Sequence, residues 1–122
     1  MEDIDYYISA VLLKTGLQKA RLDLQNEKVL QQQIYDLFIQ AGIECRREVQ
    51  LSAGNIIDFV SHQIGIEVKI NGTKKAIYKQ CERYAAHDEL LALIVVTNKS
   101  IALPSHINNK PTFIINLGQA WL

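Results

Sequence analysis

The sequence predicts a single α/β domain with a mixed central sheet, and three observations lead to this class. Residues 27–41 carry apolar side chains at helical spacing, residues 56–61 and 64–70 are short apolar segments, and residues 90–97 are a continuous apolar run. Helical and extended segments that alternate along a chain are typical of a sheet covered by helices. A length of 122 residues is enough for one domain with a real core.

The N-terminal part of the chain predicts two helices. Residues 2–24 form an expected helical leader that Gly16 breaks or loosens. Its apolar side chains follow helical spacing at Ile4, Tyr7, Ile8, Val11 and Leu12. This apolar stripe is suited to contact a second copy of the chain. The helix over 27–41 is better defined, since Asn26 is a suitable N-cap and Gly42 a suitable C-terminal stop.

Glu27 lies on the apolar face of the second predicted helix. It precedes Leu30 by three residues and Ile34 by seven, so it shares their face. A carboxylate in the first turn is stabilised by the helix dipole. This structural role and a functional role are equally open for Glu27.

The rest of the chain predicts five strands and one helix. A half-exposed or edge strand over 43–51 comes first, followed by two apolar strands over 56–61 and 64–70 that His62-Gln63 joins. A helix over 74–87 follows, with its apolar stripe at Ile77, Cys81, Tyr84 and Ala85. The last two elements are a central strand over 90–97 and a strand over 112–117. The chain is thereby divided into a leader (1–25), a core (26–98) and a C-terminal strand with its tail (99–122).

Composition and charge narrow the classes of function. Thirteen basic and thirteen acidic residues give zero net charge, which argues against a large non-specific nucleic-acid surface but allows a local basic patch. Cys45 and Cys81 are too few and too far apart for a thiolate cluster, and they favour free thiols in a reducing cytoplasm over one disulfide. Without a basic signal segment or a long apolar run, a cytoplasmic protein with no membrane partner is expected. Zinc and nucleotide-cofactor motifs do not occur.

Three charged residues interrupt the apolar strands: Asp58, Glu67 and Lys69. Alternation along a strand puts Glu67 and Lys69 on one face, and it puts Asp58 on the face opposite Ile57 and Phe59. If the two strands pair as a hairpin, Asp58 approaches Glu67 and Lys69 on a common face. Two carboxylates that close repel each other unless a cation lies between them. With a carbonyl and waters, they form the oxygen set that Mg²⁺ accepts.

Such a set serves metal-assisted hydrolysis of a phosphodiester. The metal polarises the phosphoryl oxygen and lowers the pKa of a bound water, while Lys69 orients the attack. The alternative interpretation is a cross-strand salt bridge between Asp58 and Lys69, with Glu67 exposed to solvent. The pattern of charges alone is compatible with both.

Asp58, an eight-residue gap and Glu67-Val68-Lys69 together resemble the signature of the PD-(D/E)xK nucleases, although Ile57 stands where the signature has proline. The restriction-endonuclease-like fold of that family has an αβββαβ core, which is similar to the order of elements predicted here. The resemblance implies a nuclease that depends on Mg²⁺ or Mn²⁺. It further implies that Asp58, Glu67 and the Val68 carbonyl bind the metal and that Lys69 positions the water.

Two more features are similar to that family. Its members often carry a glutamate in the first core helix, and Glu27 would then be an outer or second-metal ligand, ranked above Glu44 and Glu48. The exonuclease-like and Holliday-junction-resolvase-like branches carry a Gln-x-x-x-Tyr motif, which Gln80 and Tyr84 match. By this resemblance, Gln80 holds nucleic acid or a water near the metal and Tyr84 supports it.

Four basic residues follow on the same predicted helix: Lys74, Lys75, Lys79 and Arg83. With Tyr84, they are candidate nucleic-acid contacts at a basic rim, and a solvated helix face is the alternative. The expected substrate is DNA, cut with structure specificity or low sequence specificity, since the chain has no room for a recognition domain. A homodimer or a partner protein would supply further specificity. The rival function is a non-catalytic module that binds nucleic acid or protein on the same fold.

Overall fold

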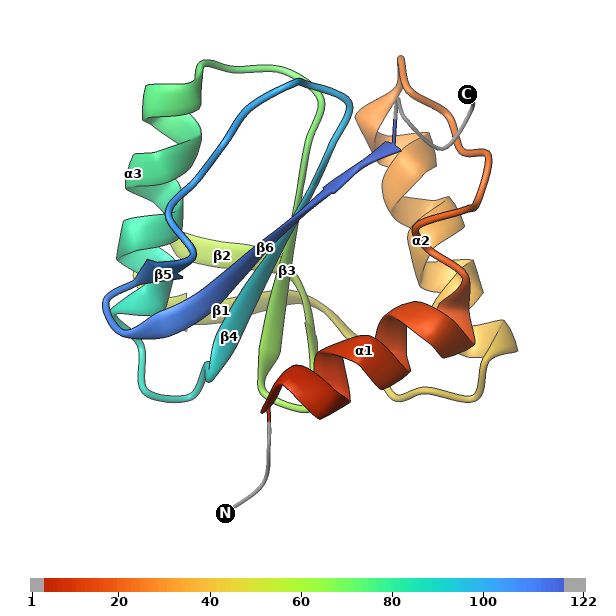
Figure 1. Cartoon of the computed structure of the whole chain (residues 1–122), viewed down its shortest axis with the longest axis horizontal. Coiled ribbons are helices and arrows are strands. Elements are labelled where there is room, and N and C mark those ends of the chain that lie inside the picture. Colours follow the sequence, from red (N-terminus) through yellow and green to blue (C-terminus); the bar gives the residue numbers. More distant parts are fainter. Residues whose placement is uncertain (1–3, 118–122) are drawn as a thin grey trace.

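The computed structural model describes residues 4–117 and folds them into six strands and three helices (Figure 1). In chain order these are α1 (Ile4–Thr15), α2 (Glu27–Gln40), β1 (Arg46–Ser52), β2 (Asn55–Ser61), β3 (Ile64–Lys69), α3 (Lys74–Ala85), β4 (Ala92–Thr97), β5 (His106–Ile107) and β6 (Lys110–Asn116). The strands of this described part lie in the order β1-β2-β3-β4-β6-β5. Parallel pairing joins β3, β4 and β6, and the other neighbours are antiparallel. The predicted α/β class with a mixed sheet is confirmed.

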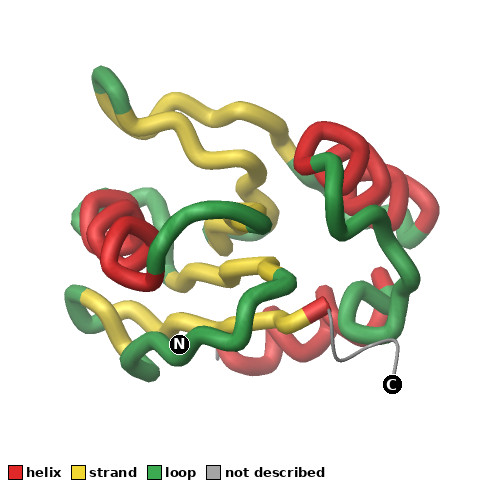
Figure 2. The backbone as a smooth tube through the Cα atoms, turned by 90° about the horizontal axis from the view of Figure 1, so that it is seen from above, coloured by secondary structure: helices red, strands yellow, loops and turns green. Residues whose placement is uncertain are grey.

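Helices cover both faces of the sheet, which Figure 2 shows from above. On one face, α1 and α2 pack over a core that includes Phe38 and Val68. On the other face, α3 packs over a second core that includes Ile77 and Leu93. Every residue of β4 is buried between these two cores, as predicted for a central strand covered on both faces.

The N-terminal helix is shorter than the predicted leader. α1 ends at Thr15, because Gly16 takes a positive φ of 66° and the chain turns there. Residues 20–26 have no helix, so the helical prediction over 2–24 is wrong beyond the first break, and residues 2 and 3 lie outside the described part. Ile8 and Val11 are buried in the core beneath α1. The apolar stripe therefore packs largely against its own sheet and α2.

The cap residues predicted for the second helix are confirmed. The Asn26 side chain accepts a hydrogen bond from a first-turn amide at 3.1 Å. At the other end, Gly42 has a φ of 70°, and the Ile43 amide donates to the Phe38 carbonyl at 3.0 Å. This arrangement is a Schellman cap. Since Ile43 completes the cap, the strand predicted from residue 43 begins only at Arg46.

Most other predicted elements are confirmed with shifted ends. The two-residue turn at His62 and Gln63 has φ values of 51° and 64°, which is the type I′ geometry preferred in hairpins. Thr73 caps α3 by accepting from the Ala76 amide at 3.1 Å. α3 ends at Ala85 and β4 begins at Ala92, each two residues inside the predicted bounds.

A hairpin near the C-terminus was not predicted. The strand expected over 112–117 begins earlier, at Lys110, and pairs with the short β5. Asn108 and Asn109 form the turn, with φ values of 49° and 64°. Asparagine tolerates this left-handed region better than other non-glycine residues, so the Asn-Asn pair was a usable signal. The predicted tail from residue 118 lies outside the described residues.

Alternation along β2 breaks at Asp58. Ile57 packs in the core beneath α3, whereas Phe59 packs in the core beneath α2. The prediction that these two residues share one face is therefore wrong. On β1, the partners change faces in the same way, because Arg47 lies against Phe59 and the α2 residue Tyr35 while Val49 packs with Ile57. On both strands of the β1–β2 hairpin, the side chains before and after the level of Asp58 therefore point to opposite faces of the sheet.

Ile57 packs directly on the backbone of Gly65. A Cβ atom at Gly65 would lie 2.6 Å from Ile57 Cδ1 and 3.0 Å from side-chain atoms of Leu90 and Leu93. Gly65→Ala is expected to destabilise the domain by about 1–3 kcal/mol through overpacking, measured by urea denaturation. Shortening the contact atom in the double variant Gly65→Ala/Ile57→Val should recover part of that loss. Unchanged stability of Gly65→Ala would contradict this packing.

The described residues bear on two predictions from composition, one about membrane-spanning helices and one about the cysteines. Within 4–117, no helix has both the length and the apolar character needed to span a bilayer. Cys45 is half-buried, Cys81 is buried, and both are free thiols, in line with the sequence prediction. Burial raises the pKa of each thiol to about 11, so both stay protonated and poorly nucleophilic at neutral pH.

Candidate functional site

The candidate site lies where β2 and β3 separate. Pairing between these strands ends at Phe59 and Ile66, while β3 continues beside β4 as far as Lys69 and Thr97. In the same register, the next pair would be Asp58 of β2 and Glu67 of β3, which are the two carboxylates of the predicted site. The strands therefore open at the position of the predicted site.

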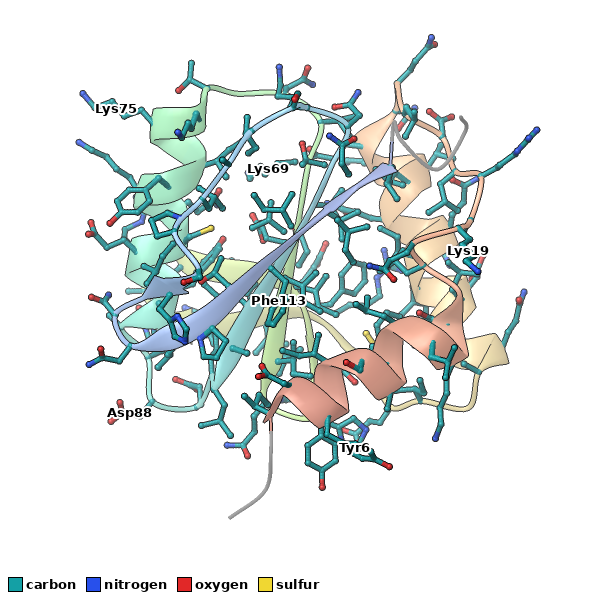
Figure 3. All side chains as sticks on the ribbon, viewed as in Figure 1. Tyr6, Lys19, Lys69, Lys75, Asp88 and Phe113 are labelled. Carbon is teal, nitrogen blue, oxygen red and sulfur yellow. The ribbon has the colours of Figure 1, made fainter. Side chains whose placement is uncertain are left out.

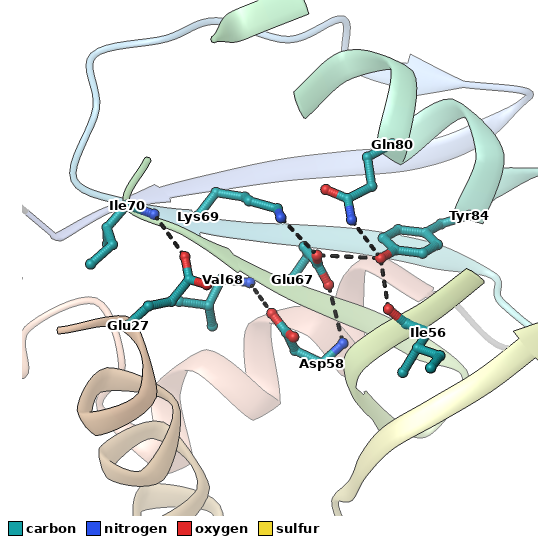
Figure 4. Close-up of polar contacts among 9 residues, drawn as sticks. All are labelled: Glu27, Ile56, Asp58, Glu67, Val68, Lys69, Ile70, Gln80 and Tyr84. Carbon is teal, nitrogen blue, oxygen red and sulfur yellow. Dashed lines mark hydrogen bonds and ion pairs between the residues drawn. The ribbon is translucent and has the colours of Figure 1, made fainter. Parts of the chain in front are cut away.

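Carboxylates occupy the edge of β3 that β2 leaves uncovered. The Val68 amide donates to Asp58 Oδ2 at 2.8 Å, and the Ile70 amide donates to Glu27 Oε1 at 3.4 Å (Figure 4). Asp58 comes from β2 and Glu27 from the first turn of α2. The inward direction predicted for Glu27 is confirmed. Side chains thus replace the backbone partners that a continued ladder would supply.

Glu67 is the buried centre of the site. It is 5% exposed, and its Oε1 accepts a hydrogen bond from the Asp58 amide at 3.1 Å. Its Oε2 lies 3.4 Å from Lys69 Nζ and 3.3 Å from the Tyr84 hydroxyl (Figure 4). The alternative interpretation, an Asp58–Lys69 salt bridge with Glu67 in solvent, is wrong on both points. Lys69 pairs with Glu67, and Glu67 is enclosed.

The surroundings of Asp58 and Glu67 disfavour a negative charge on either carboxylate. Burial raises the pKa of Glu67 to about 8, and the charge of Asp58 adds to this effect, while Lys69 opposes it. Burial also raises the pKa of Asp58, which the Val68 amide and Lys69 partly offset and the charge of Glu27 reinforces. One lysine therefore does not balance the acidic groups around the opening, and their ionised forms are disfavoured.

α3 closes the site from the other face of the sheet. Gln80 Nε2 donates to the Tyr84 hydroxyl at 2.8 Å, across one helical turn, and the hydroxyl donates to the Ile56 carbonyl at 2.8 Å. The single proton of the hydroxyl serves only one acceptor, so an ionised Glu67 competes with Ile56 for it. Tyr84 is 2% exposed, so it supports Gln80 and Glu67 from inside the molecule.

Tyr84→Phe is expected to lower the free energy of unfolding by about 1–2 kcal/mol, because it leaves the Ile56 carbonyl and the Gln80 amide without their shared partner. Tyr78→Phe on the same helix is the matched control, since its hydroxyl makes one long contact of 3.5 Å with exposed Glu82. Thermal and urea unfolding measure both variants. Equal effects of the two would contradict a specific role for the Tyr84 hydroxyl.

The basic residues of α3 begin at its N-terminal end, which lies at the same end of the molecule as Lys69 (Figure 3). Lys74, Lys75 and Lys79 are exposed, and Figure 3 shows Lys75 beside the end that carries Lys69, far from Tyr6 and Asp88. Arg83 is also exposed, but its Nε donates to Asn55 Oδ1 at 3.3 Å. The lysines are available to a ligand, while Arg83 ties α3 to the first residue of β2.

The oxygen donors at the opening suit a hard divalent cation. Within residues 4–117, no cluster of three or more His, Cys, Asp and Glu side chains is placed to hold a metal. A metal would therefore depend on Asp58, Glu67 and a backbone oxygen. In an extended strand, the N–H and C=O of one residue point to the same side, so the Val68 carbonyl points into the gap with the amide that Asp58 binds. Glu44 and Glu48, which the sequence analysis ranked below Glu27 as ligands, have exposed side chains.

Sequence reasoning missed the backbone partners of this site. The amides of Asp58, Val68 and Ile70 orient the carboxylates, and no residue type in the sequence marks an unpaired amide. Comparison of the chain with protein families, with curated proteins and with solved structures gives no match. What the chain does is therefore inferred from the site itself.

Proposed function

We propose that the chain is a Mg²⁺-dependent nuclease of the PD-(D/E)xK type, built on a restriction-endonuclease-like αβββαβ core. The observation that carries this proposal is the meeting of Asp58, Glu67 and Lys69 at the opening between β2 and β3 (Figure 4). Glu27 and Gln80 border the same region from α2 and α3. The spacing of these residues in the sequence and their geometry agree on one set, which supports the assignment.

The donor set fits a Mg²⁺ or Mn²⁺ ion. Asp58, Glu67 and the Val68 carbonyl would hold it, with Glu27 as an outer ligand, because hard cations prefer oxygen ligands. The raised pKa of Glu67, caused by burial and by Asp58, supports the fit, since a cation would offset the excess negative charge. When bound, the ion would supply a Lewis acid for a phosphoryl oxygen and lower the pKa of a nearby water.

The remaining residues would handle the substrate and the water. The Lys69 side chain is 25% exposed, so its ammonium group reaches solvent at the opening and can orient a water or neutralise a phosphate oxygen. The Gln80 amide is held by Tyr84 in a fixed direction, which suits a contact to substrate or water. The exposed Lys74, Lys75 and Lys79 would attract the phosphate backbone.

The expected substrate is DNA, with structure specificity or low sequence specificity. Net charge is zero, so phosphate binding would depend on the local basic end of α3 and not on the whole surface. The chain is small, and a homodimer or a partner protein would add specificity. A cytoplasmic location suits such an enzyme and its free thiols.

A non-catalytic binding module on the same fold is the second candidate. One observation favours it: Asp58 and Glu27 already accept hydrogen bonds from β3 amides, so both carboxylates have a structural use without a metal. A module of this kind would bind nucleic acid through the α3 lysines and would leave the phosphodiester intact.

An activity panel tests the proposal. Purified protein is incubated with supercoiled, linear, single-stranded and branched DNA, and with RNA, in Mg²⁺, Mn²⁺ or EDTA. Lys69→Ala is compared with Lys19→Ala, an exposed lysine away from the opening (Figure 3). We expect cleavage in Mg²⁺ that EDTA and Lys69→Ala abolish and that Lys19→Ala retains.

Two outcomes would change the assignment. Cleavage that survives EDTA or Lys69→Ala would overturn the mechanism. Binding of DNA without cleavage on every substrate would favour the non-catalytic module.

A further inference from the structure

We propose that Glu48 is a positioning residue whose backbone conformation aims Asp58 into the opening between β2 and β3. The inference rests on the proposed function for its catalytic meaning, but the geometry that it describes is independent of any metal. Glu48 has a φ of 49°, in the left-handed region that non-glycine residues rarely adopt, and it does so inside strand β1. Backbone strain of this kind concentrates at functional sites.

The ladder between β1 and β2 skips Glu48 and Asp58. Arg47 pairs with Phe59 and Val49 pairs with Ile57, so Glu48 lies opposite Asp58 between two paired positions. On its other side, β2 stops pairing with β3 at Phe59. Asp58 is thus released from both neighbouring strands, and its amide donates to Glu67 Oε1 at 3.1 Å. A regular ladder would use that amide for a backbone partner.

The change of face along the hairpin coincides with Glu48. Arg47 and Phe59 lie on the α2 side of the sheet, while Val49 and Ile57 lie on the α3 side. The register on the two sides of Glu48 is the same, so no residue is inserted, and the positive φ lets β1 turn over without a bulge. The turned backbone leaves Asp58 directed along the sheet toward Val68, where its Oδ2 accepts the 2.8 Å hydrogen bond.

The effect of Glu48 would come from its backbone and not from its carboxylate. The residue is exposed, and its sequence neighbours Arg47 and Val49 fix the two ends of the turn. Glu48→Gly and Glu48→Val both remove the carboxylate, but glycine adopts positive φ freely and a β-branched residue resists it. The difference between these two variants therefore isolates the backbone conformation.

Gln50 supplies the matched control. It is an exposed β1 residue that pairs with Ile56 and has no positive φ. Glu48→Gly, Glu48→Val, Gln50→Gly and Gln50→Val are compared by amide hydrogen exchange in EDTA. The Val68 amide reports its bond to Asp58, and the Val95 amide, in buried β4, reports global unfolding.

We expect Glu48→Val to speed exchange at Val68 at least tenfold relative to Val95, and Glu48→Gly to stay within about twofold of the wild type. Both Gln50 variants should leave that ratio unchanged. Mn²⁺ affinity, measured by calorimetry, should fall at least tenfold in Glu48→Val and be retained in Glu48→Gly. If Glu48→Val does not fold, Glu48→Ala is compared with Glu48→Gly in the same way.

A Val68 exchange rate that follows Val95 in every variant would overturn the inference, as would equal losses in Glu48→Gly and Glu48→Val. Wild-type protein that binds no Mn²⁺ would count against the proposed metal site alone. The exchange ratio at Val68 would then still decide whether Glu48 directs Asp58.

Discussion

Asp58→Asn is expected to reduce Mg²⁺-dependent cleavage by about 100-fold or more and to weaken Mn²⁺ binding at least tenfold. The substitution removes one of the two carboxylates at the opening but keeps the shape of the side chain. Its amide oxygen can still accept the hydrogen bond from the Val68 amide. The free energy of unfolding should therefore change by no more than about 1 kcal/mol.

Asp36→Asn is the control for this variant. Asp36 is an exposed carboxylate on α2 that accepts a hydrogen bond from Gln32, and its loss should leave cleavage and Mn²⁺ affinity unaltered. Cleavage rates, calorimetry and urea unfolding are measured on both variants and the wild type. Full activity in Asp58→Asn would exclude Asp58 as a metal ligand, and equal losses in both variants would indicate an indirect effect.

Glu67→Gln is expected to abolish cleavage while it stabilises the metal-free protein at alkaline pH. Burial raises the folded pKa of Glu67 from 4.5 to about 8. Between these values the folded state binds a proton that the unfolded state releases, so the free energy of unfolding falls as pH rises, by up to about 1 kcal/mol per pH unit. Glutamine cannot ionise, so the variant loses this slope. We expect it to exceed the wild type by roughly 3–5 kcal/mol at pH 8.5.

Urea unfolding in EDTA at pH 5.5 and pH 8.5 measures this prediction. Glu44→Gln, at an exposed carboxylate, should leave the pH dependence as it is in the wild type. A wild-type protein whose stability does not fall over this range would mean that the charge of Glu67 is already compensated. If Glu67→Gln raises the free energy of unfolding at pH 8.5 and abolishes cleavage, the carboxylate serves activity and lowers stability.

The parts of the fold that follow from local rules were predictable from the sequence. The α2 helix is set by its apolar stripe, by Asn26 and by Gly42, and each of these acts within a few residues. The continuous apolar run gave the central strand β4. The helical prediction over 2–24 failed because it continued the helix past Gly16. β5 was missed because a two-residue strand shows too little alternation, and the Asn108-Asn109 turn signal was not used.

The candidate site was predictable as a set of residues but not as a geometry. Alternation brought Glu67 and Lys69 to one face, and the structure joins them at 3.4 Å. The same rule failed for Ile57 and Phe59, because it assumes a regular backbone and β1 has a positive φ at Glu48. Glutamate has no intrinsic preference for that conformation, so no residue type announces it. The approach of Asp58 to Glu67 depends on this non-local feature.

The separation of β2 from β3 has a further consequence for solubility. An extended strand with unpaired amides is a template on which another chain can add, and β3 would present such a row at Val68 and Ile70. Asp58 and Glu27 occupy those donors and place negative charge along the row. A chain that lost both acids would keep its cores but would expose unpaired backbone amides at the edge of β3, to which another strand could pair. The carboxylates to which we assign chemistry would thus also protect the molecule from association with other extended chains.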